Sequence, residues 1–358
     1  MAELNRNDLN LETHIEQTQD VFSRLPNELV TIIFSYLLFD SEVPLRSHRA
    51  PARLIPVCCR FKRIVDESPE LWTIVVISER GGFRHLPDYL ARSNGMPIDV
   101  TLYPLDDQYQ NTFLRRAGPI LGEKRRWREV VIGMRAPWAT LHPLLPTLEQ
   151  APLLTRLSIR QSFGAPYEPL DGLDYVVPDY PGVRVLDVSE VCVNTIGIGT
   201  TGLQELGVRT RLSNSDAWAA FSGLLNRNPS LRRVKADLPV PEAQDDQPPP
   251  FDSSTPISLP SLTSFELRIS PTTRLDTFLQ TLNAPKLSQL SVKPTIFDIN
   301  PKADFTGLIA TCIKQFNSLK EITLDRYDQE SYKIVREDVL VHQLEEIGIT
   351  VRLKSIGD

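Results

Sequence analysis

The stretch Leu154-Thr155-Arg156-Leu157-Ser158-Ile159 (LTRLSI, residues 154–159) has apolar residues at its first, fourth and sixth positions. The same pattern recurs along the chain, with successive copies starting 20 to 32 residues apart. The nine copies begin at Trp127, Leu154, Val183, Leu203, Leu231, Leu262, Leu287, Leu319 and Leu344. A recurrence at this spacing is typical of an array of similar units, each containing one short strand and its return segment.

The segments between the copies have helical character and turn signals. Prolines stand shortly before several copies, as in Ala151-Pro152 and Asn228-Pro229, and mark turns. We expect helices over 216–228, 273–283 and 305–316. The pattern resembles the leucine-rich repeat, in which each L-x-x-L-x-L segment forms a parallel strand and the copies stack on one another. The Asn or Cys that usually follows the triplet is absent from every copy, so the resemblance implies an irregular, degenerate solenoid.

Two regions around the array lack the clear pattern. Residues 73–78 and 98–103 are predicted strands flanking a predicted helix over 86–94, and with 127–133 they are expected to begin the same sheet. Residues 239–258 are proline-rich and acidic without apolar periodicity, which predicts a disordered or extended loop. A polyproline ligand for another domain is an alternative for this loop, and a single doubly wound α/β domain is an alternative for the whole fold.

The first predicted helix, within LPNELVTIIFSYLLFD (25–40), is apolar on more than one side. Pro26 suits a first turn, because its missing N–H is not needed there. On a helical wheel the apolar residues span an arc of roughly 240°, whereas a surface helix needs a stripe of little more than ~100° to cover its own core. These residues are Leu29, Val30, Ile32, Ile33, Phe34, Tyr36, Leu37 and Leu38. Either the rest of the chain or another protein must cover the surplus, because monomers seldom expose large apolar patches.

A second helical segment follows a polar loop at 41–53. Its apolar residues recur at helical spacing, and Ser68-Pro69 ends the pattern before a short turn. They are Val57, Cys58, Phe61, Ile64 and Val65. A segment of about fifty residues buries only ~60% of its unfolded surface and is marginally stable alone.

This region resembles the F-box, a short helical module that docks on the Skp-type adaptor of cullin–RING ubiquitin ligases. The resemblance lies in the Leu-Pro pair, the apolar first helix, the Val-Cys-x-Arg segment and the final Leu-Trp. It implies adaptor-binding roles for Leu25, Pro26, Leu29, Ile33, Phe34, Leu37, Val57, Cys58, Arg60, Leu71 and Trp72. Two departures are the aromatic residue directly after the arginine, Phe61, and the long loop at 41–53. Six basic residues and no acidic one stand between residues 43 and 65, which suits an acidic partner.

Composition excludes several classes of function. The chain has 358 residues, a net charge of −6 and four cysteines. The charge argues against bulk electrostatic binding of nucleic acid. The unpaired cysteine spacing predicts small buried thiols in a reducing compartment. Gly197-Ile198-Gly199-Thr200-Thr201-Gly202 matches the dinucleotide fingerprint, but it precedes a predicted strand where the cofactor would need a helix. The histidines show no metal spacing, and no nucleophile motif occurs.

The expected protein is therefore an α/β chain without catalytic activity, cofactor or metal. We expect a flexible tail at 1–21, an F-box-like module at 22–78 and a solenoid with a parallel sheet at 79–358. The resemblance implies a substrate-recognition subunit of a Skp–cullin–F-box ubiquitin ligase, partnered by the adaptor, a cullin and an unknown target, in the cytoplasm or nucleus and away from membranes. A scaffold protein without ligase function is the alternative. Because side chains alternate along a strand, we expect target contacts at the exposed strand positions Ser158, Arg160, Asp187, Arg209, Glu266, Arg268 and Asp325.

Overall fold

A parallel sheet of eleven strands, arranged in chain order, organises the computed structural model. The structure describes residues 22, 24–39, 50–78, 85–103, 110–134, 148, 150–161, 180–189, 200–209, 215–238, 256–269, 278–292, 312, 314–325, 339–346 and 348–354. The sheet comprises β1 (Ile74–Ser78), β2 (Ile98–Tyr103), β3 (Trp127–Met134), β4 (Arg156–Gln161), β5 (Val185–Ser189), β6 (Glu205–Arg209), β7 (Arg233–Leu238), β9 (Ser264–Ile269), β11 (Gln289–Val292), β12 (Glu321–Asp325) and β13 (Thr350–Lys354). A separate parallel pair is formed by β8 (Ile257–Ser258) and β10 (Leu282–Asn283).

The helices precede or connect these strands. The α-helices are α2 (Asn27–Phe39), α3 (Ala50–Leu54), α4 (Cys59–Glu67), α5 (Leu86–Arg92), α6 (Gln110–Gly122), α8 (Ser215–Arg227) and α12 (Val339–Glu346). Two 3₁₀ turns, η2 (Pro69–Trp72) and η4 (Lys124–Arg126), lead into β1 and β3.

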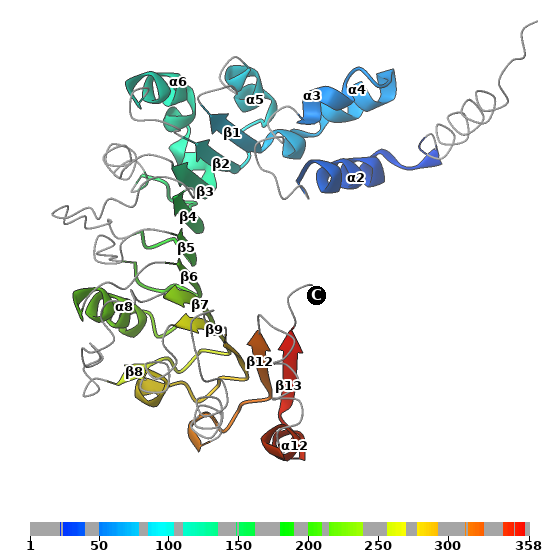
Figure 1. Cartoon of the computed structure of the whole chain (residues 1–358). Coiled ribbons are helices and arrows are strands. Elements are labelled where there is room, and N and C mark those ends of the chain that lie inside the picture. Colours follow the sequence, from blue (N-terminus) through cyan, green and yellow to red (C-terminus); the bar gives the residue numbers. More distant parts are fainter. Residues whose placement is uncertain are drawn as a thin grey trace, which may run out of the picture.

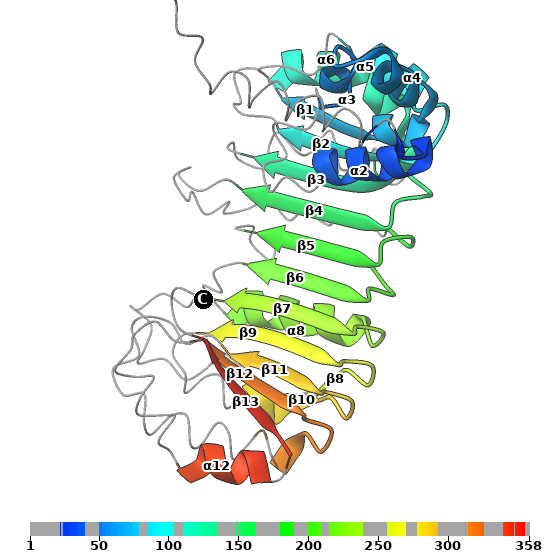
Figure 2. The same cartoon turned by 90° about the vertical axis from the view of Figure 1, so that its right-hand side faces the viewer.

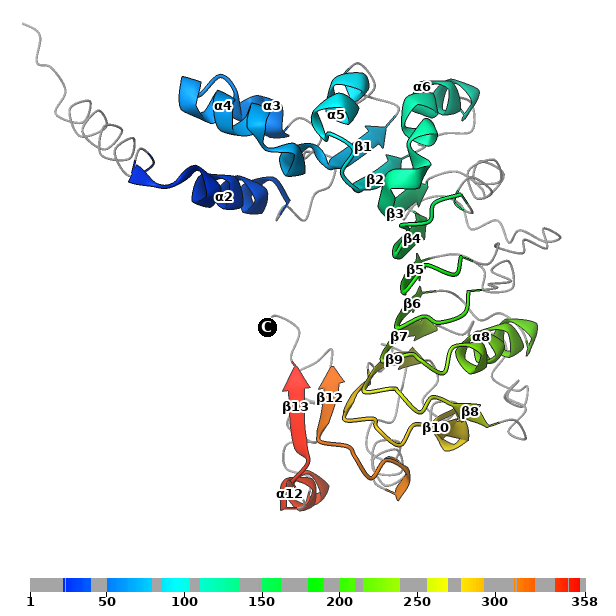
Figure 3. The same cartoon turned by 180° about the vertical axis from the view of Figure 1, so that it is seen from behind.

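The sheet is strongly curved (Figure 1). In Figure 3, α8 and the β8–β10 pair lie on the outer side of the curve. Figure 2 looks onto the inner face, with α2 in front of the sheet near its β1 end. The outer side therefore carries the covering segments, while much of the inner strand face is open.

The register of the strands explains which side is buried. Val130, Leu157, Leu186, Leu206 and Val234 form one continuous row across β3 to β7, and all are buried. A second buried row lies two residues further along the same strands. These rows and the apolar side of α8 belong to one hydrophobic core. Because side chains alternate along a strand, the residues between the rows lie on the inner face.

The predicted strands and helices are largely confirmed. Eight of the nine triplets coincide with a strand of the sheet, and the strands expected at 73–78 and 98–103 are its first two members. The predicted helices at 86–94 and 216–228 correspond to α5 and α8. Residues 74–78, placed in the helical module by sequence, pair with β2. The glycine-rich segment does lead into a strand, β6.

Four predictions were wrong in detail. The last triplet was misplaced, because Leu344 lies in α12 and Val351 takes the strand position opposite Ile322. Val57 and Cys58 precede helix α4, and the end of the predicted loop at 41–53 contains α3. Cys58 and Cys59 are exposed, and of the predicted buried thiols that the structure describes, only Cys312 is buried.

Several predictions fall outside the described residues. These are the tail at 1–21, Cys192, most of helix 305–316, residues 273–277 of the predicted helix 273–283 and the proline-rich segment over 239–255. The last residues of that proline-rich stretch include β8.

Backbone and hydroxyl groups supply the hydrogen-bond partners of the turns at the edge where the strands begin. The amides of Arg184 and Val185 both donate to the carbonyl of Thr155, at 2.8 and 3.0 Å, and the same arrangement recurs at later strands. Asn228 is fully buried; its Oδ1 accepts from the Leu203 amide at 3.0 Å and its Nδ2 donates to the Leu224 carbonyl at 2.9 Å. Gly202 has φ +90°, and a Cβ there would stand 2.8 Å from Nη1 of Arg184.

Candidate docking surfaces

The N-terminal module, which comprises the described residues between Phe22 and Trp72, has a small hydrophobic core of its own. Val30 and Phe34 of α2 pack there with Ile64 and Val65 of α4. The ring of Phe34 meets that of Phe61 edge-on, with 4.9 Å between centroids. This geometry is favourable for aromatic rings, so one side of α2 is held firmly against α4.

Trp72 joins the module to the sheet. Its ring is buried, its Nε1 donates to the Val65 carbonyl at 2.8 Å, and it makes a T-shaped contact with the ring of Tyr89 of α5. The guanidinium of Arg92 lies over the ring at 4.4 Å and also pairs with Asp66 at 2.6 Å. Burial raises the pKa of Tyr89 to about 12, although Arg92 opposes the shift. The aromatic pair at the joint is thus buried, while the Arg92–Asp66 ion pair beside it is partly exposed.

Arg60 fixes the start of α2. Its guanidinium donates to the side-chain oxygen of Asn27, at 2.9 Å from Nη2, and to the carbonyls of Phe22 and Leu25. These contacts use all three nitrogens of the guanidinium. The adaptor contact that the family resemblance implies for Arg60 stays a prediction, and the structure shows its guanidinium bonded to the Leu25 carbonyl.

The opposite side of α2 is apolar and exposed. Leu29 is 46% exposed, Ile32 50%, Tyr36 70% and Leu37 67%. At ~100° per residue, these four side chains and the half-buried Ile33 form one continuous arc beside the buried pair. Val57, 61% exposed, precedes α4. An exposed apolar face of this kind is a candidate interaction site. We call Leu29, Ile32, Ile33, Tyr36 and Leu37 the α2 apolar face.

The residues predicted to bind an adaptor divide into three groups. Leu29, Leu37 and Val57, with Pro26 and Cys58, are exposed. Leu25, Ile33 and Arg60 are partly buried. Phe34, Leu71 and Trp72 are 1–3% exposed and have no free surface, so we correct their role to support of the module's core. The sequence-based set omitted Ile32 and Tyr36, although the helical wheel had already placed both in the apolar arc.

Positive charge lies in the same module. Arg53, Lys62 and Arg63 are exposed, and Arg46 and Arg49 lie outside the described residues. Exposed charges at the rim of a docking face mainly affect association rates and partner choice. The surface is therefore an apolar face with basic residues in the same small module.

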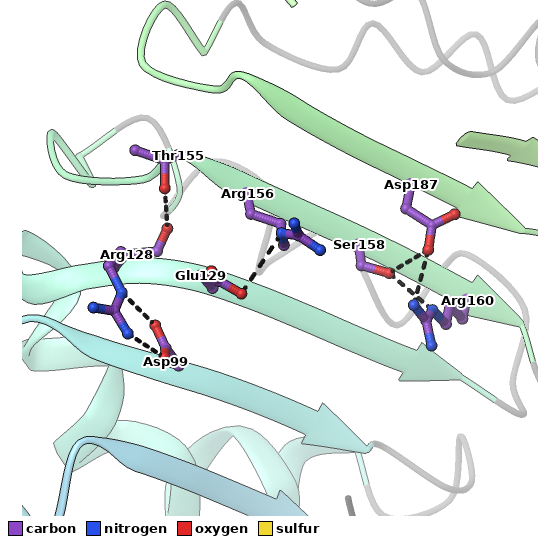
Figure 4. A network of polar contacts seen from close by, with 8 residues as sticks. All are labelled: Asp99, Arg128, Glu129, Thr155, Arg156, Ser158, Arg160 and Asp187. Carbon is purple, nitrogen blue, oxygen red and sulfur yellow. Dashed lines mark hydrogen bonds and ion pairs between the residues drawn. The ribbon is translucent and has the colours of Figure 1, made fainter. Parts of the chain in front are cut away.

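The inner face of the sheet carries charged pairs across neighbouring strands (Figure 4). Arg128 donates to both carboxylate oxygens of Asp99, at 2.9 and 2.5 Å, and these hydrogen bonds hold the pKa of Arg128 above its usual value. Nη2 of Arg160 lies 2.9 Å from Oδ2 of Asp187. Further pairs join Glu129 to Arg156, Glu205 to Arg233, Arg209 to Asp237, Lys235 to Glu266 and Glu321 to Arg352.

The residues predicted to bind a target have mixed surroundings. Arg160 is exposed, while Asp187, Arg209 and Glu266 are partly exposed and paired with neighbours. Ser158 is buried at 2% exposure and lies in the Arg160–Asp187 network, so its prediction as an exposed contact was wrong. The side chains of Arg268 and Asp325 lie outside what the structure describes.

Neither a metal site nor a membrane span is found in the described part of the chain. No three His, Cys, Asp or Glu side chains there gather closely enough to hold an ion. None of the helices described is long and apolar enough to cross a bilayer.

Tyr103 lies partly buried on the sheet, and its burial raises the pKa of its hydroxyl. Its ring lies so close to Gly133 that a Cβ at that position would clash with it.

Comparisons with known proteins do not assign the chain. No protein-family model matches it, and no curated protein matches it at a significant level.

Proposed function

We propose that the protein is the target-recruiting subunit of a Skp–cullin–F-box ubiquitin ligase. The N-terminal module would act as the F-box and bind the Skp-type adaptor. The curved sheet, with its covering segments, would act as a degenerate leucine-rich-repeat solenoid that holds the target. Catalysis would then belong to other subunits, and this chain would raise the effective concentration of a target lysine near the transferred ubiquitin.

The α2 apolar face is the observation that carries the proposal. Its neighbours Val30 and Phe34 complete the module's own core, and the remaining arc keeps about half or more of the surface of Leu29, Ile32, Tyr36 and Leu37 uncovered in the described structure. Keeping Leu37 two-thirds exposed brings no stability to the free chain, since hydrophobic stabilisation scales with the apolar area removed from water. A partner helix or groove that covers this arc would gain that stabilisation on binding.

The architecture of the sheet supports the second half of the proposal. The order of the strands in the eleven-stranded sheet follows the sequence, and all of its pairings are parallel, which is the arrangement of stacked repeats. Such arrays present an extended curved surface to a partner. In Figure 1, the module and β13 lie at opposite ends of the curve, so the sheet extends well beyond the module and offers a separate surface for a target.

A binding measurement with a purified Skp-type adaptor, alone and bound to the N-terminal part of a cullin, tests the proposal. Ile32→Lys/Leu37→Lys places two charges in the α2 apolar face without touching the core. Met96→Lys/Leu153→Lys is the matched control, because these side chains are 38% and 46% exposed and lie outside the module.

We expect calorimetric binding of the wild type and the control to the adaptor, and its loss in the α2 variant. Circular dichroism and a thermal melt of each variant establish that the chain is folded. Equal binding of both variants would overturn the docking face. Absence of binding by the folded wild type would favour a scaffold protein without ligase function.

A further inference from the structure

A polar pocket of about 490 Å³ opens at the edge of the sheet where β6 and β7 begin. This edge lies on the right in Figure 2, below the helices of the N-terminal module. Residues that precede or begin four consecutive sheet strands line it, among them Glu205, Arg232, Arg233, Ser261, Thr263 and Lys286. The pocket is therefore built from equivalent positions of neighbouring units.

The pocket has an excess of positive charge in a chain whose net charge is −6. It contains three cations and one carboxylate. That carboxylate, Glu205, lies 3.4 Å from Nη1 of Arg233. Among the described residues, no hydrogen bond or ion pair reaches the guanidinium of Arg232 or the ammonium of Lys286. Two charges thus remain available to a ligand.

The inner face offers a contrast. There Arg160, Lys235 and Arg352 each face a carboxylate on a neighbouring strand, at 2.9, 3.2 and 3.0 Å. A ligand binding to those cations must compete with a carboxylate already in place. At Arg232 and Lys286 it meets no such competitor within the described structure, so the pocket is the better anion site.

The backbone beneath the pocket is well fixed. The carbonyl of Arg232 accepts from the amides of Thr263 and Ser264, at 2.9 and 3.1 Å, and from the Thr263 hydroxyl at 3.0 Å. The carbonyl of Thr263 accepts from the amides of Ser288 and Gln289, at 3.0 Å each. The start points of the cationic side chains are therefore held in register before any ligand arrives, which reduces the ordering needed on binding.

We propose that this pocket binds an acidic segment of a partner protein, through carboxylate or phosphate groups that contact Arg232 and Lys286. Arg233 would add a third contact while keeping its pair with Glu205. The inference rests on the proposed function in one respect: the segment would belong to the target. The target would then be recognised at the edge where the strands begin, and not on the inner strand face.

Fluorescence anisotropy with the full chain, in the absence of any adaptor, tests the pocket. The probes are labelled peptides of repeated Glu-Ser, Gln-Ser and Gln-phosphoserine. Arg232→Gln/Lys286→Gln removes the two available charges. Arg125→Gln/Lys314→Gln is the matched control, because it removes two exposed charges elsewhere. All four side chains are solvent-exposed, so the variants should fold as the wild type does.

We expect at least one acidic peptide to bind the wild type and the control equally, and the neutral Gln-Ser peptide not to bind. From the ordinary strength of exposed ion pairs, we expect the pocket variant to bind the acidic peptide about two- to thirtyfold more weakly than the wild type does. Added salt should weaken binding, and charge reversal with Arg232→Glu/Lys286→Glu should abolish it. The better of the two acidic peptides identifies the group as carboxylate or phosphate.

Equal losses in the pocket and control variants would overturn the site, as would failure of the wild type to bind either acidic peptide. Displacement of the peptide by an equal concentration of inorganic phosphate would show a small-anion site and overturn the assignment to a protein segment. Because the assay contains no adaptor, its outcome is independent of whether the module docks on one.

Discussion

Truncation of Leu29 and Leu37 to alanine should weaken adaptor binding without unfolding the chain. These side chains are 46% and 67% exposed, so together they leave about the surface of one leucine uncovered. Full burial of one leucine stabilises by about 1.5–3 kcal/mol. Since alanine retains part of that surface, the double variant should lose about 1–2 kcal/mol of binding free energy, or roughly a five- to thirtyfold rise in Kd.

Titration calorimetry of Leu29→Ala/Leu37→Ala against the adaptor measures this change directly. Met96→Ala/Leu153→Ala is the control, with comparable exposure outside the module. The covered parts of the two side chains also amount to about one side chain in each variant, so the free energy of unfolding in urea should fall by about 1–2 kcal/mol in both. A Kd within twofold of wild type would refute the assignment of this face. A large loss of stability would show that the chain itself already covers both leucines.

Three further predictions concern stability. Phe34→Ala should lower the free energy of unfolding by about 3–5 kcal/mol, because Phe34 is only 2% exposed. Tyr36→Ala, two residues away, should change it little, because Tyr36 is 70% exposed. Comparable losses for both variants in urea denaturation would contradict the division of α2 into a buried and an exposed side. Asn228→Ala leaves the buried Leu203 amide and Leu224 carbonyl without partners, so its free energy of unfolding should be lower by about 1–3 kcal/mol. Asn226→Ala removes an exposed hydrogen bond and should lower it less. Equal losses would count against the buried bridge. Because the pKa of Tyr89 rises from 10.0 to about 12 on folding, the unfolded chain loses this proton first, and stability should fall between these pH values by up to about 3 kcal/mol. Urea denaturation at about pH 9 and about pH 11.5 measures this fall, Tyr89→Phe should remove most of it, and an unchanged fall in that variant would exclude Tyr89 as its source.

The sheet was predictable from sequence because each unit repeats the same local demand. Leu157 and Ile159 must both be buried on one side of a strand, and the same spacing at Leu186 and Val188 places the next strand beside it. The last strand was misplaced because α12 also supplies an apolar residue, Leu344, at a suitable distance. Three apolar residues at these spacings can occur in a helix as well as in a strand, so the pattern alone does not distinguish the two.

The candidate docking face was only partly predictable. The helical wheel showed that α2 has too many apolar residues, but it could not show that Val30 and Phe34, rather than Leu29 and Leu37, turn toward α4. That choice depends on where Phe61 and Val65 lie in three dimensions. The pocket at Arg232 and Lys286 had no signal in the sequence, because these residues are 54 positions apart and meet only through the strand register.

The chain-order arrangement of the sheet has a mechanical consequence. Each interior strand of the eleven-stranded sheet hydrogen-bonds only to the two strands next to it in that sheet, whose order follows the sequence. A pulling force applied between the two ends of the molecule would therefore load one strand pair at a time. The chain should extend in a series of small steps, peeling from either end, and the strands furthest from the tear would keep their pairing until the rupture reached them.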